Sequence, residues 1–578
     1  MVKFDRKFLV FWIVAVGLVV GRICLGRMVS VFYLPEAYCD DALMVGYACF
    51  DDYFRQELPG IFPLHYAVKD LGYPLFVRLW YSLGMYYTDG VAILWTIAAG
   101  AAVYLFRELT ETRNPLLLLA VFAFVLFHPA AFDAQTGTRL YRNSILAPTY
   151  LIVFALMTVV VLWHGKNKFL SVGKFALFQT ALSFFFVFAY FVKEDGLWLL
   201  LCLLTALFWC AWLFVGNHRA EPKKALITYL FILCLPLLIL GGATSAYKEI
   251  NYRCFGVREI NVRMAGEMGR YSKFVYDIAS PNRTPYVWAP ADAVLKTFEA
   301  SPSLRDNYEL REAVLTSSLA GGDIYANPIP LDFVTWVLFK ALYETGTCVS
   351  VAEVEDYLHR VNEELELAFE KGELTKDGRI RLMPSMGGRT LEEIIVLPRF
   401  SLSVYAVYIG NYGYTPGAMA NRLRSEVYPY DEKYFATDFP LLDRAKELTR
   451  MDFDQENEYA ATANRIAEKL CCLYRFMQTA MIVMALAGLI LGVVKLIRRD
   501  KGTYERLKYP GGIIVCFGLL SFVYICALGW FYGFTPDLNL FEPKIFCGLK
   551  FACVGAIPML IMIELAGVCL FWRLIADH

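Results

Sequence analysis

The chain has 578 residues, of which 58% are hydrophobic and 16% aromatic, while only 19% are charged. Its mean hydropathy is +0.46, whereas a soluble protein of this length would carry about 25% charged residues. The composition therefore favours a membrane protein that crosses the bilayer several times. The formal net charge of +0 argues against a nucleic-acid partner, because phosphate binding along a polynucleotide needs a basic excess.

Hydrophobic segments long enough to cross a bilayer recur along the chain. We expect ten membrane-spanning helices, at about residues 8–25, 88–106, 115–131, 145–163, 174–192, 196–215, 225–243, 474–495, 511–532 and 546–571. No small-residue cleavage site follows the first segment, so we expect it to remain as an anchor and not to be removed as a signal peptide.

The loops between these segments differ in their content of Lys and Arg, which are retained on the cytoplasmic side. One alternating set of short loops holds most of them, while the opposite set holds only Arg139, Arg142, Lys193 and Lys544. We therefore expect both termini in the cytoplasm and the long segments 26–87 and 244–473 outside. The absence of obvious retention signals suits a bacterial cytoplasmic membrane.

Three parts follow from this arrangement: a transmembrane module at 1–243 with its first outer loop at 26–87, an outer domain at 244–473, and C-terminal transmembrane helices at 474–578. In the outer domain, apolar residues recur at steps of three and four between Val351 and Ala368, which predicts an amphipathic helix. The fold class that we expect is mainly α, a polytopic helical bundle with a large and mostly helical extracytoplasmic domain.

Lys193, Glu194 and Asp195 stand together in the sequence "VKEDG", between the fifth and sixth predicted spans. A charge at the bilayer centre costs about 2.5–3.5 kcal/mol on insertion scales, so such a group belongs at a boundary. Taken alone, this stretch is equally well explained as a solvated turn on the outer face.

The other outer loops carry polar residues of a particular kind. The first contains the adjacent carboxylates Asp40 and Asp41, and it ends with Lys69 and Tyr73 in "KDLGYPL"; the second contains Arg139 and Arg142. A carboxylate can accept the proton of an attacking hydroxyl, while Lys and Arg can hold an anionic leaving group such as a phosphate. Transfer of a sugar from a lipid phosphate to a hydroxyl would use both.

This pattern resembles the GT-C superfamily of polyprenyl-phosphate-sugar-dependent membrane glycosyltransferases, which includes protein O-mannosyltransferases and lipid A aminoarabinose transferases. The resemblance covers roughly residues 1–215. The usual first-loop pair is Asp-Glu, where this chain has Asp40-Asp41, and the usual Lys-Pro-Pro-Leu element corresponds to the altered sequence from Lys69 to Leu75. The resemblance implies a GT-C-like bundle that transfers a sugar, with inversion, from a polyprenyl-phosphate lipid donor to an extracytoplasmic glycan, lipid or protein acceptor.

The resemblance also implies roles for individual residues. Asp40 would be the catalytic base, and Asp41 would support it or bind a divalent metal ion in those members that use one. The remaining candidates divide into donor phosphate binding, by Lys69, Arg139, Arg142 and Lys193, and substrate binding, by Glu194, Asp195 and Tyr73. Glu194 and Asp195 could instead orient the cations.

Other interpretations remain open at this point. Asp40 could cap a helix, Arg139 and Arg142 could bind lipid headgroups, and Asp51 and Asp52 fit a solvated helix face. A transporter or flippase for a lipid-linked sugar is the main alternative, and it would begin from Glu564, an acid inside the last span that could equally be a packing residue. A noncatalytic surface-presenting protein is a further alternative, in which Asp40 would be freely replaceable.

Four of the fifteen cysteines lie clearly outside the predicted spans, namely Cys39, Cys49, Cys254 and Cys348. They could form disulfides in an oxidising compartment, and the sequence does not decide the pairing. The six histidines of the chain show no spacing typical of metal ligands.

Overall fold

The computed structural model describes residues 6–34, 40–58, 63–168, 170–217, 223–413, 415, 417, 419–420, 441–451, 453, 458–498, 502–536, 538–544 and 546–575. This part of the chain is almost entirely helical. Its only β pairing consists of isolated bridges, such as Phe32 with Arg139 and Ile380 with Arg389. The expectation of a mainly α fold is confirmed. Nine helices in the described residues are long and apolar enough to cross a bilayer, which is consistent with the expected multi-pass membrane protein.

Eight of the ten expected spans coincide with such helices. They are α1 (Arg6–Met28), α5 (Tyr87–Thr110), α7 (Asn143–Gly165), α8 (Val172–Tyr190), α9 (Gly196–Asn217), α24 (Glu458–Ile497), α26 (Pro510–Tyr532) and the run from α27 (Gly548–Ala552) through η4 (Cys553–Gly555) to α28 (Ala556–Ile575). The expected span at 225–243 is a pair, α10 (Lys223–Leu233) and α11 (Leu235–Phe255), bent by 53°. The expected span at 115–131 is a shorter apolar helix, α6 (Pro115–Leu126), followed by η2 (Pro129–Ala131).

The ninth apolar segment, Leu391–Gly410, was not among the expected spans. It comprises α19 (Leu391–Ile395) and α20 (Leu397–Gly410), and its mean hydropathy of 1.3 is the lowest of the nine. Arg389, just before it, donates a hydrogen bond to the carbonyl of Trp530 at the end of α26, and the hydroxyl of Tyr405 lies 2.8 Å from that of Ser521 further along α26.

The chain after α20 returns to the end of the bundle from which it came. The amide of Thr415 donates to Asp133, in the loop that leads into the first turn of α7, at 3.0 Å. That end of α7 and the C-terminal end of α26 belong together, because Tyr150 and Tyr524 both donate hydrogen bonds to Asp195. The chain before α19 and the chain after α20 therefore lie at one end of the bundle, with α20 beside α26.

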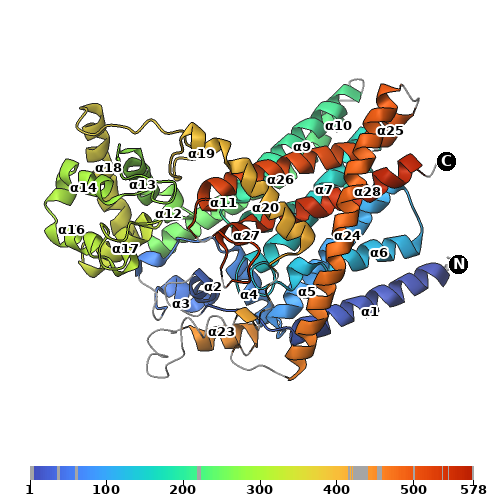
Figure 1. Ribbon diagram of the computed structural model, residues 1–578, viewed down its shortest axis with the longest axis horizontal. Coiled ribbons are helices and arrows are strands. Elements are labelled where there is room, and N and C mark those ends of the chain that lie inside the picture. Colours follow the sequence, from blue (N-terminus) through green and yellow to red (C-terminus); the bar gives the residue numbers. More distant parts are fainter. Residues whose placement is uncertain are drawn as a thin grey trace.

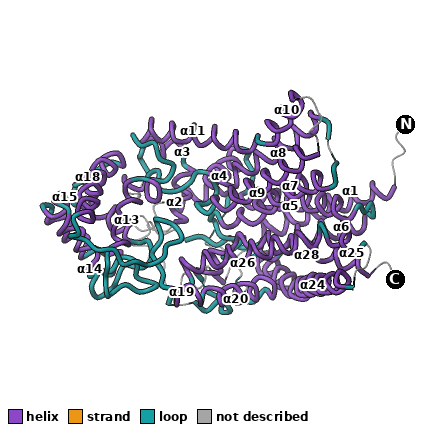
Figure 2. Tube along the Cα trace, turned by 90° about the horizontal axis from the view of Figure 1, so that it is seen from above, coloured by secondary structure: helices purple, strands orange, loops and turns teal. Residues whose placement is uncertain are grey.

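The two ends of the described chain lie at one end of the molecule, near α10 and α25 (Thr503–Leu507), and a domain of short helices lies at the other (Figure 1). This is the arrangement expected for an even number of crossings. Seen from above, the short helices form a separate body beyond the long parallel ones (Figure 2).

This helical domain contains the elements α12 (Val262–Ala265), α13 (Glu267–Asp277), α14 (Ala291–Ala300), α15 (Pro302–Arg305), α16 (Tyr308–Leu315), η3 (Ser318–Ala320), α17 (Val334–Glu344) and α18 (Val351–Glu370). The helix predicted from periodicity is α18, and its apolar positions from Val351 to Ala368 are buried. Ser350 caps it by accepting the amide of Glu353, as Ser does at helix N-termini.

A layer of short helices connects the bundle with this domain. It consists of η1 (Pro63–His65) and α2 (Asp40–Ala48), α3 (Phe50–Arg55) and α4 (Gly72–Ser82), with α23 (Leu442–Thr449) packed on α2 and α4. Gly72 opens α4 against the chain at Phe191, whose carbonyl accepts its amide at 2.8 Å, and a Cβ at Gly72 would come within 2.3 Å of that oxygen. This close approach brings the first outer loop to the turn that carries Lys193, Glu194 and Asp195.

Candidate functional site

Asp40 and Asp41 form the first turn of α2, where the helix dipole favours negative side chains. Their side chains point into different surroundings. Asp41 is fully buried and forms a two-pronged pair with Arg139, with contacts of 2.6 and 2.8 Å, and it also accepts the amide of Leu34 at 3.3 Å. Burial raises the pKa of Asp41 even though Arg139 opposes this change. Asp41 therefore ties α2 to the second outer loop and is closed off from a substrate.

Asp40 is the accessible member of the pair, because its side chain is 34% exposed. Its Oδ2 lies 2.9 Å from the ammonium of Lys69 and accepts the hydroxyl of Tyr141 at 2.9 Å. Burial would raise the pKa of Asp40, but Lys69 and Arg142 outweigh it and lower the pKa to about 2. Asp40 is therefore a carboxylate at neutral pH.

Four charged side chains alternate in sign around this point, and we call them the Asp40 cluster: Asp40, Lys69, Arg142 and Glu194. Lys69 lies between Asp40 at 2.9 Å and Glu194 at 3.8 Å, while Arg142 lies between Glu194 at 2.5 Å and Asp40 at 3.8 Å. Burial acts to raise the pKa of Glu194, yet Arg142 and Lys69 hold it well below its ordinary value. The structure thus brings together residues from three predicted outer loops, between positions 40 and 194 of the chain.

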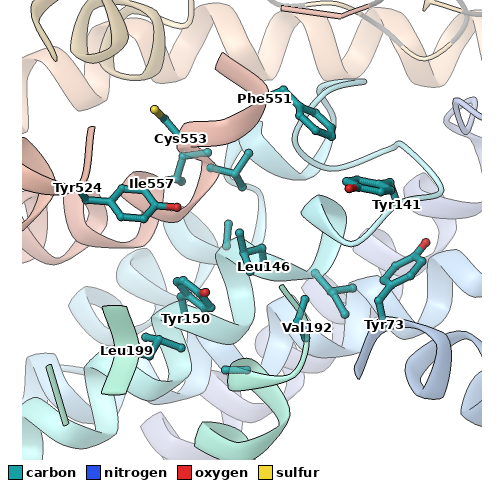
Figure 3. Close-up of a cluster of buried hydrophobic side chains, with 14 of the residues drawn as sticks. Tyr73, Tyr141, Leu146, Tyr150, Val192, Leu199, Tyr524, Phe551, Cys553 and Ile557 are labelled. Atoms are coloured by element: carbon teal, nitrogen blue, oxygen red, sulfur yellow. The ribbon is translucent and has the colours of Figure 1, made fainter. Parts of the chain in front are cut away.

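Lys193 and Asp195 form a neighbouring pair at 3.4 Å. Lys193 also donates to the carbonyl of Ala552, and Asp195 accepts hydrogen bonds from Tyr524 at 2.6 Å and Tyr150 at 3.3 Å. Figure 3 shows Tyr150 and Tyr524 with Tyr141 and Tyr73 among buried side chains from several elements. Tyr150 and Tyr524 therefore hold Asp195, and with it the turn from Lys193 to Asp195, from the interior of the bundle.

Tyr73 does not join the Asp40 cluster through its hydroxyl. It is fully buried and donates to the hydroxyl of Tyr87 at 3.1 Å. Tyr87 in turn contacts Ser144 and donates to the carbonyl of Arg139 at 3.3 Å. In this structure Tyr73 is a packing residue under the second outer loop.

The helical domain contributes residues that sequence reasoning did not identify. Arg263 of α12 pairs with Asp332, and both Arg263 and Lys69 lie over the ring of Trp336, at 5.2 and 5.6 Å from its centre. Arg263 also acts electrostatically on Glu194 and on Lys69. No spacing in the sequence connects these residues with the first outer loop, whereas Tyr141 could have been found because it stands between Arg139 and Arg142.

Asp70 is a further acid beside the Asp40 cluster. It is 7% exposed, and burial raises its pKa to about 8, to which the neighbouring Glu194 adds. At neutral pH it is therefore mostly protonated, which reduces the negative charge next to Glu194.

Each cation predicted to bind the donor phosphate has a carboxylate within 4 Å: Lys69, Arg139, Arg142 and Lys193 face Asp40, Asp41, Glu194 and Asp195 respectively. The charges of these eight side chains cancel. An incoming phosphate must therefore compete with carboxylates for these cations. This competition is easiest at Lys69 and Arg142, because each of them is shared between two carboxylates. Across the described ranges, no group of three or more His, Cys, Asp or Glu side chains is arranged to hold a metal ion.

The other acids and the cysteines noted in the sequence lie apart from the Asp40 cluster. Asp51 has an 80% exposed side chain and Asp52 a 33% exposed one, as expected for a solvated helix face. Glu564 is buried and accepts the amide of Gln478 at 3.1 Å. Cys49, Cys254 and Cys348 are free thiols, and Cys39 lies outside the described residues.

Comparisons of the chain with protein-family models, with curated proteins and with solved structures found no match.

Proposed function

We propose that this protein is a membrane glycosyltransferase of GT-C type, which transfers a hexose or pentose, with inversion, from a polyprenyl-phosphate donor to an extracytoplasmic acceptor in a bacterial cytoplasmic membrane. The observation that carries the proposal is Asp40, an ionised and accessible carboxylate held among cations at one end of a membrane bundle. Such a group can orient a hydroxyl nucleophile, and its neighbours can hold an anionic leaving group.

The reaction would be a single displacement at the anomeric carbon. The acceptor oxygen forms a bond to that carbon while the bond from carbon to the phosphate oxygen breaks, and the lipid phosphate leaves with the electron pair. The acceptor proton passes to Asp40. Because the pKa of Asp40 is about 2, it is a weak base, so proton transfer comes late, when the attacking oxygen has become acidic.

Lys69 and Arg142 are the cations best placed to receive the lipid phosphate in this proposal. Both are shared between two carboxylates, so either can turn toward a third anion without leaving a carboxylate unpaired. Arg139 is held by both oxygens of Asp41 and Lys193 by Asp195 and a backbone carbonyl. For these two we propose a supporting role, in which they position the loops.

The helical domain is proposed to recognise the acceptor. Trp336 presents an aromatic ring beside Lys69 and Arg263, and aromatic faces suit sugar rings. The acceptor hydroxyl would then approach Asp40 from the side of this domain, and the donor lipid from the bundle.

A lipid-linked sugar transporter is a second candidate, and one observation favours it. Glu564 of α28 is buried and hydrogen-bonded to Gln478, which also contacts His128. His128 and Gln478 line a small pocket together with residues of α20 and α28. Buried ionisable groups within a membrane mark substrate or proton paths in many transporters.

One experiment separates the two candidates. The purified protein is placed in liposomes with a panel of polyprenyl-phosphate hexoses and pentoses and with candidate acceptors, and free polyprenyl phosphate is measured by mass spectrometry. In parallel, movement of the sugar across the bilayer is followed by its accessibility to an impermeant oxidant. The proposal expects release of polyprenyl phosphate that survives Glu564→Gln. Translocation without release, abolished by Glu564→Gln, would establish the transporter instead.

A further inference from the structure

Arg22 is a buried cation in the wall of the membrane bundle. It lies on α1, a helix whose other faces are mostly exposed and apolar, at Trp12, Ile13, Val16 and Val20, yet Arg22 itself is 2% exposed. Arg27, five residues further on, pairs with Asp89 at 2.8 Å. No described carboxylate pairs with Arg22, and its Nε has no hydrogen-bond partner in the described residues.

Arg22 lines a small hollow between α1, α5 and the second outer loop. Two threonines of the same wall, Thr88 on α5 and Thr138 in the loop, are also buried, and their hydroxyls lack partners among the described residues. Gly26 leaves room beside the guanidinium, since a Cβ there would come within 2.9 Å of its Nη1. Three unsatisfied hydrogen-bonding groups, one of them cationic, therefore line a single hollow.

Burial of an arginine without a counter-charge costs free energy, because no ion pair offsets the desolvation of the cation. The ring of Phe132, with its centre 4.6 Å from the guanidinium carbon of Arg22, offsets part of this desolvation cost by a cation–π contact. It leaves the buried Nε of Arg22 and the two hydroxyls without a partner among the described residues. An anion with several oxygens would satisfy all three groups, and an arginine fork matches the oxygens of a phosphate.

We propose that this cavity binds the phosphate group of a membrane lipid. Arg22 stands six residues before the end of α1 at Met28, which is about 9 Å along the helix at 1.5 Å per residue. That end of α1 adjoins the outer loops, so the cavity lies at the depth of lipid headgroups. The exposed apolar face of α1 provides the surface along which the acyl chains lie.

This site goes beyond the proposed transferase function. None of the residues that line the cavity belongs to the Asp40 cluster or is a predicted donor-binding residue. Binding here is therefore measured without reference to turnover, and its failure would leave the proposed function untouched.

The test is lipid binding by native mass spectrometry on the purified, detergent-solubilised protein. Dioctanoyl phosphatidylglycerol is titrated against the parent, Arg22→Gln and the matched control Arg107→Gln, which removes an exposed arginine of α5. We expect the parent and the control to bind one lipid with the same affinity, and Arg22→Gln to bind it about tenfold more weakly or not at all. Equal binding by the parent and Arg22→Gln would overturn the proposal.

Two further titrations complete the test. Thr138→Val keeps the charge of Arg22 but removes one hydroxyl, so we expect an intermediate loss of affinity for the lipid. If Arg22→Gln does not fold, Thr138→Val takes its place in the test. Unchanged lipid binding by Thr138→Val would then overturn the proposal. Inorganic phosphate is titrated alone in the third arm. Arg22-dependent binding of inorganic phosphate that excludes the lipid would overturn the lipid as the carrier of the phosphate.

Discussion

Two adjacent aspartates illustrate how strongly surroundings determine the role of a residue. Asp40 and Asp41 have the same chemistry and share one helical turn, but Asp41 is fully buried against Arg139 while Asp40 faces the cluster and solvent. The sequence pattern that led us to both residues cannot distinguish them, because the difference depends on the position of the second outer loop. Asp40 is available for chemistry, and Asp41 holds the loop that carries Arg142.

Replacing Asp41 by alanine is expected to destabilise the protein by about 3–5 kcal/mol, because it leaves the buried Arg139 without its partner. The thermal unfolding midpoint of the detergent-solubilised protein measures this effect. Asp51→Ala serves as the control, and since that side chain is 80% exposed we expect a change within about 0.5 kcal/mol. Equal midpoints for Asp41→Ala and the parent would show that the pair is not structural.

Asp70 makes the stability depend on pH in a definite direction. Its pKa rises on folding to about 8 from about 4 in the unfolded chain, so the folded state keeps a proton that the unfolded state releases. The stability associated with this group is full below pH 4 and is lost as the pH rises from about 4 to 8. Asp70→Asn removes that dependence. Between pH 5 and pH 8 we expect the unfolding midpoint of Asp70→Asn to rise relative to that of the parent. Parallel curves of midpoint against pH would refute the raised pKa of Asp70.

At the scale of elements, α18 shows what hydrophobic periodicity can predict. The positions at steps of three and four between Val351 and Ala368 are buried, and they pack α18 on α13. The segment α19–α20 shows the limit of such reasoning. Its apolar run is interrupted by acids and by Pro398 and Arg399, so hydropathy alone assigned it to the outer domain, whereas contacts with α26 determine its place.

Leu358 tests the packing of α18 directly. It is fully buried, so Leu358→Ala is expected to lower the stability of the helical domain by about 2–5 kcal/mol. The measurement is hydrogen exchange of the amides in α13 and α18. Leu367, on the same helix but 48% exposed, provides the matched control, and Leu367→Ala should exchange like the parent. Similar exchange in the two variants would mean that α18 does not depend on this core.

At the scale of the whole molecule, the two ends of the chain lie opposite the helical domain (Figure 1). The guanidinium of Arg573, near the end of α28, donates to the carbonyl of Leu109, so the loop between α5 and α6 belongs to the end that holds the termini. Together with the distribution of Lys and Arg, this predicts a cytoplasmic position for that loop and an outer position for the helical domain.

Epitope insertion tests this orientation. One tag is inserted after Arg113 and another after Gly322, both in exposed loops, and sealed spheroplasts are treated with protease. We expect the tag at 322 to be removed and the tag at 113 to be protected until the membrane is broken. Removal of both tags, or protection of the one at 322, would contradict the predicted topology.

Hydropathy predicted most of the crossings because the requirement for about twenty apolar residues acts locally. The sequence also predicted that carboxylates and cations would meet on one face, and Asp40, Lys69, Arg142 and Glu194 do so. Arg263, Asp332 and Trp336 were missed because they reach the site only through packing of the helical domain. The surroundings of Arg22 were missed for the same reason, since no local signal distinguishes a buried arginine from one that reaches the membrane surface.

The rate of polyprenyl phosphate release tests whether Asp40 acts in sugar transfer. Release of polyprenyl phosphate is measured for the parent, Asp40→Asn and Asp51→Asn with the donor that gives turnover. We expect equal rates for the parent and Asp51→Asn, and a rate lower by about 10²–10⁴ for Asp40→Asn, the usual contribution of a general base, with unchanged donor binding. Release by Asp40→Asn at the rate of the parent would show that Asp40 is not the base.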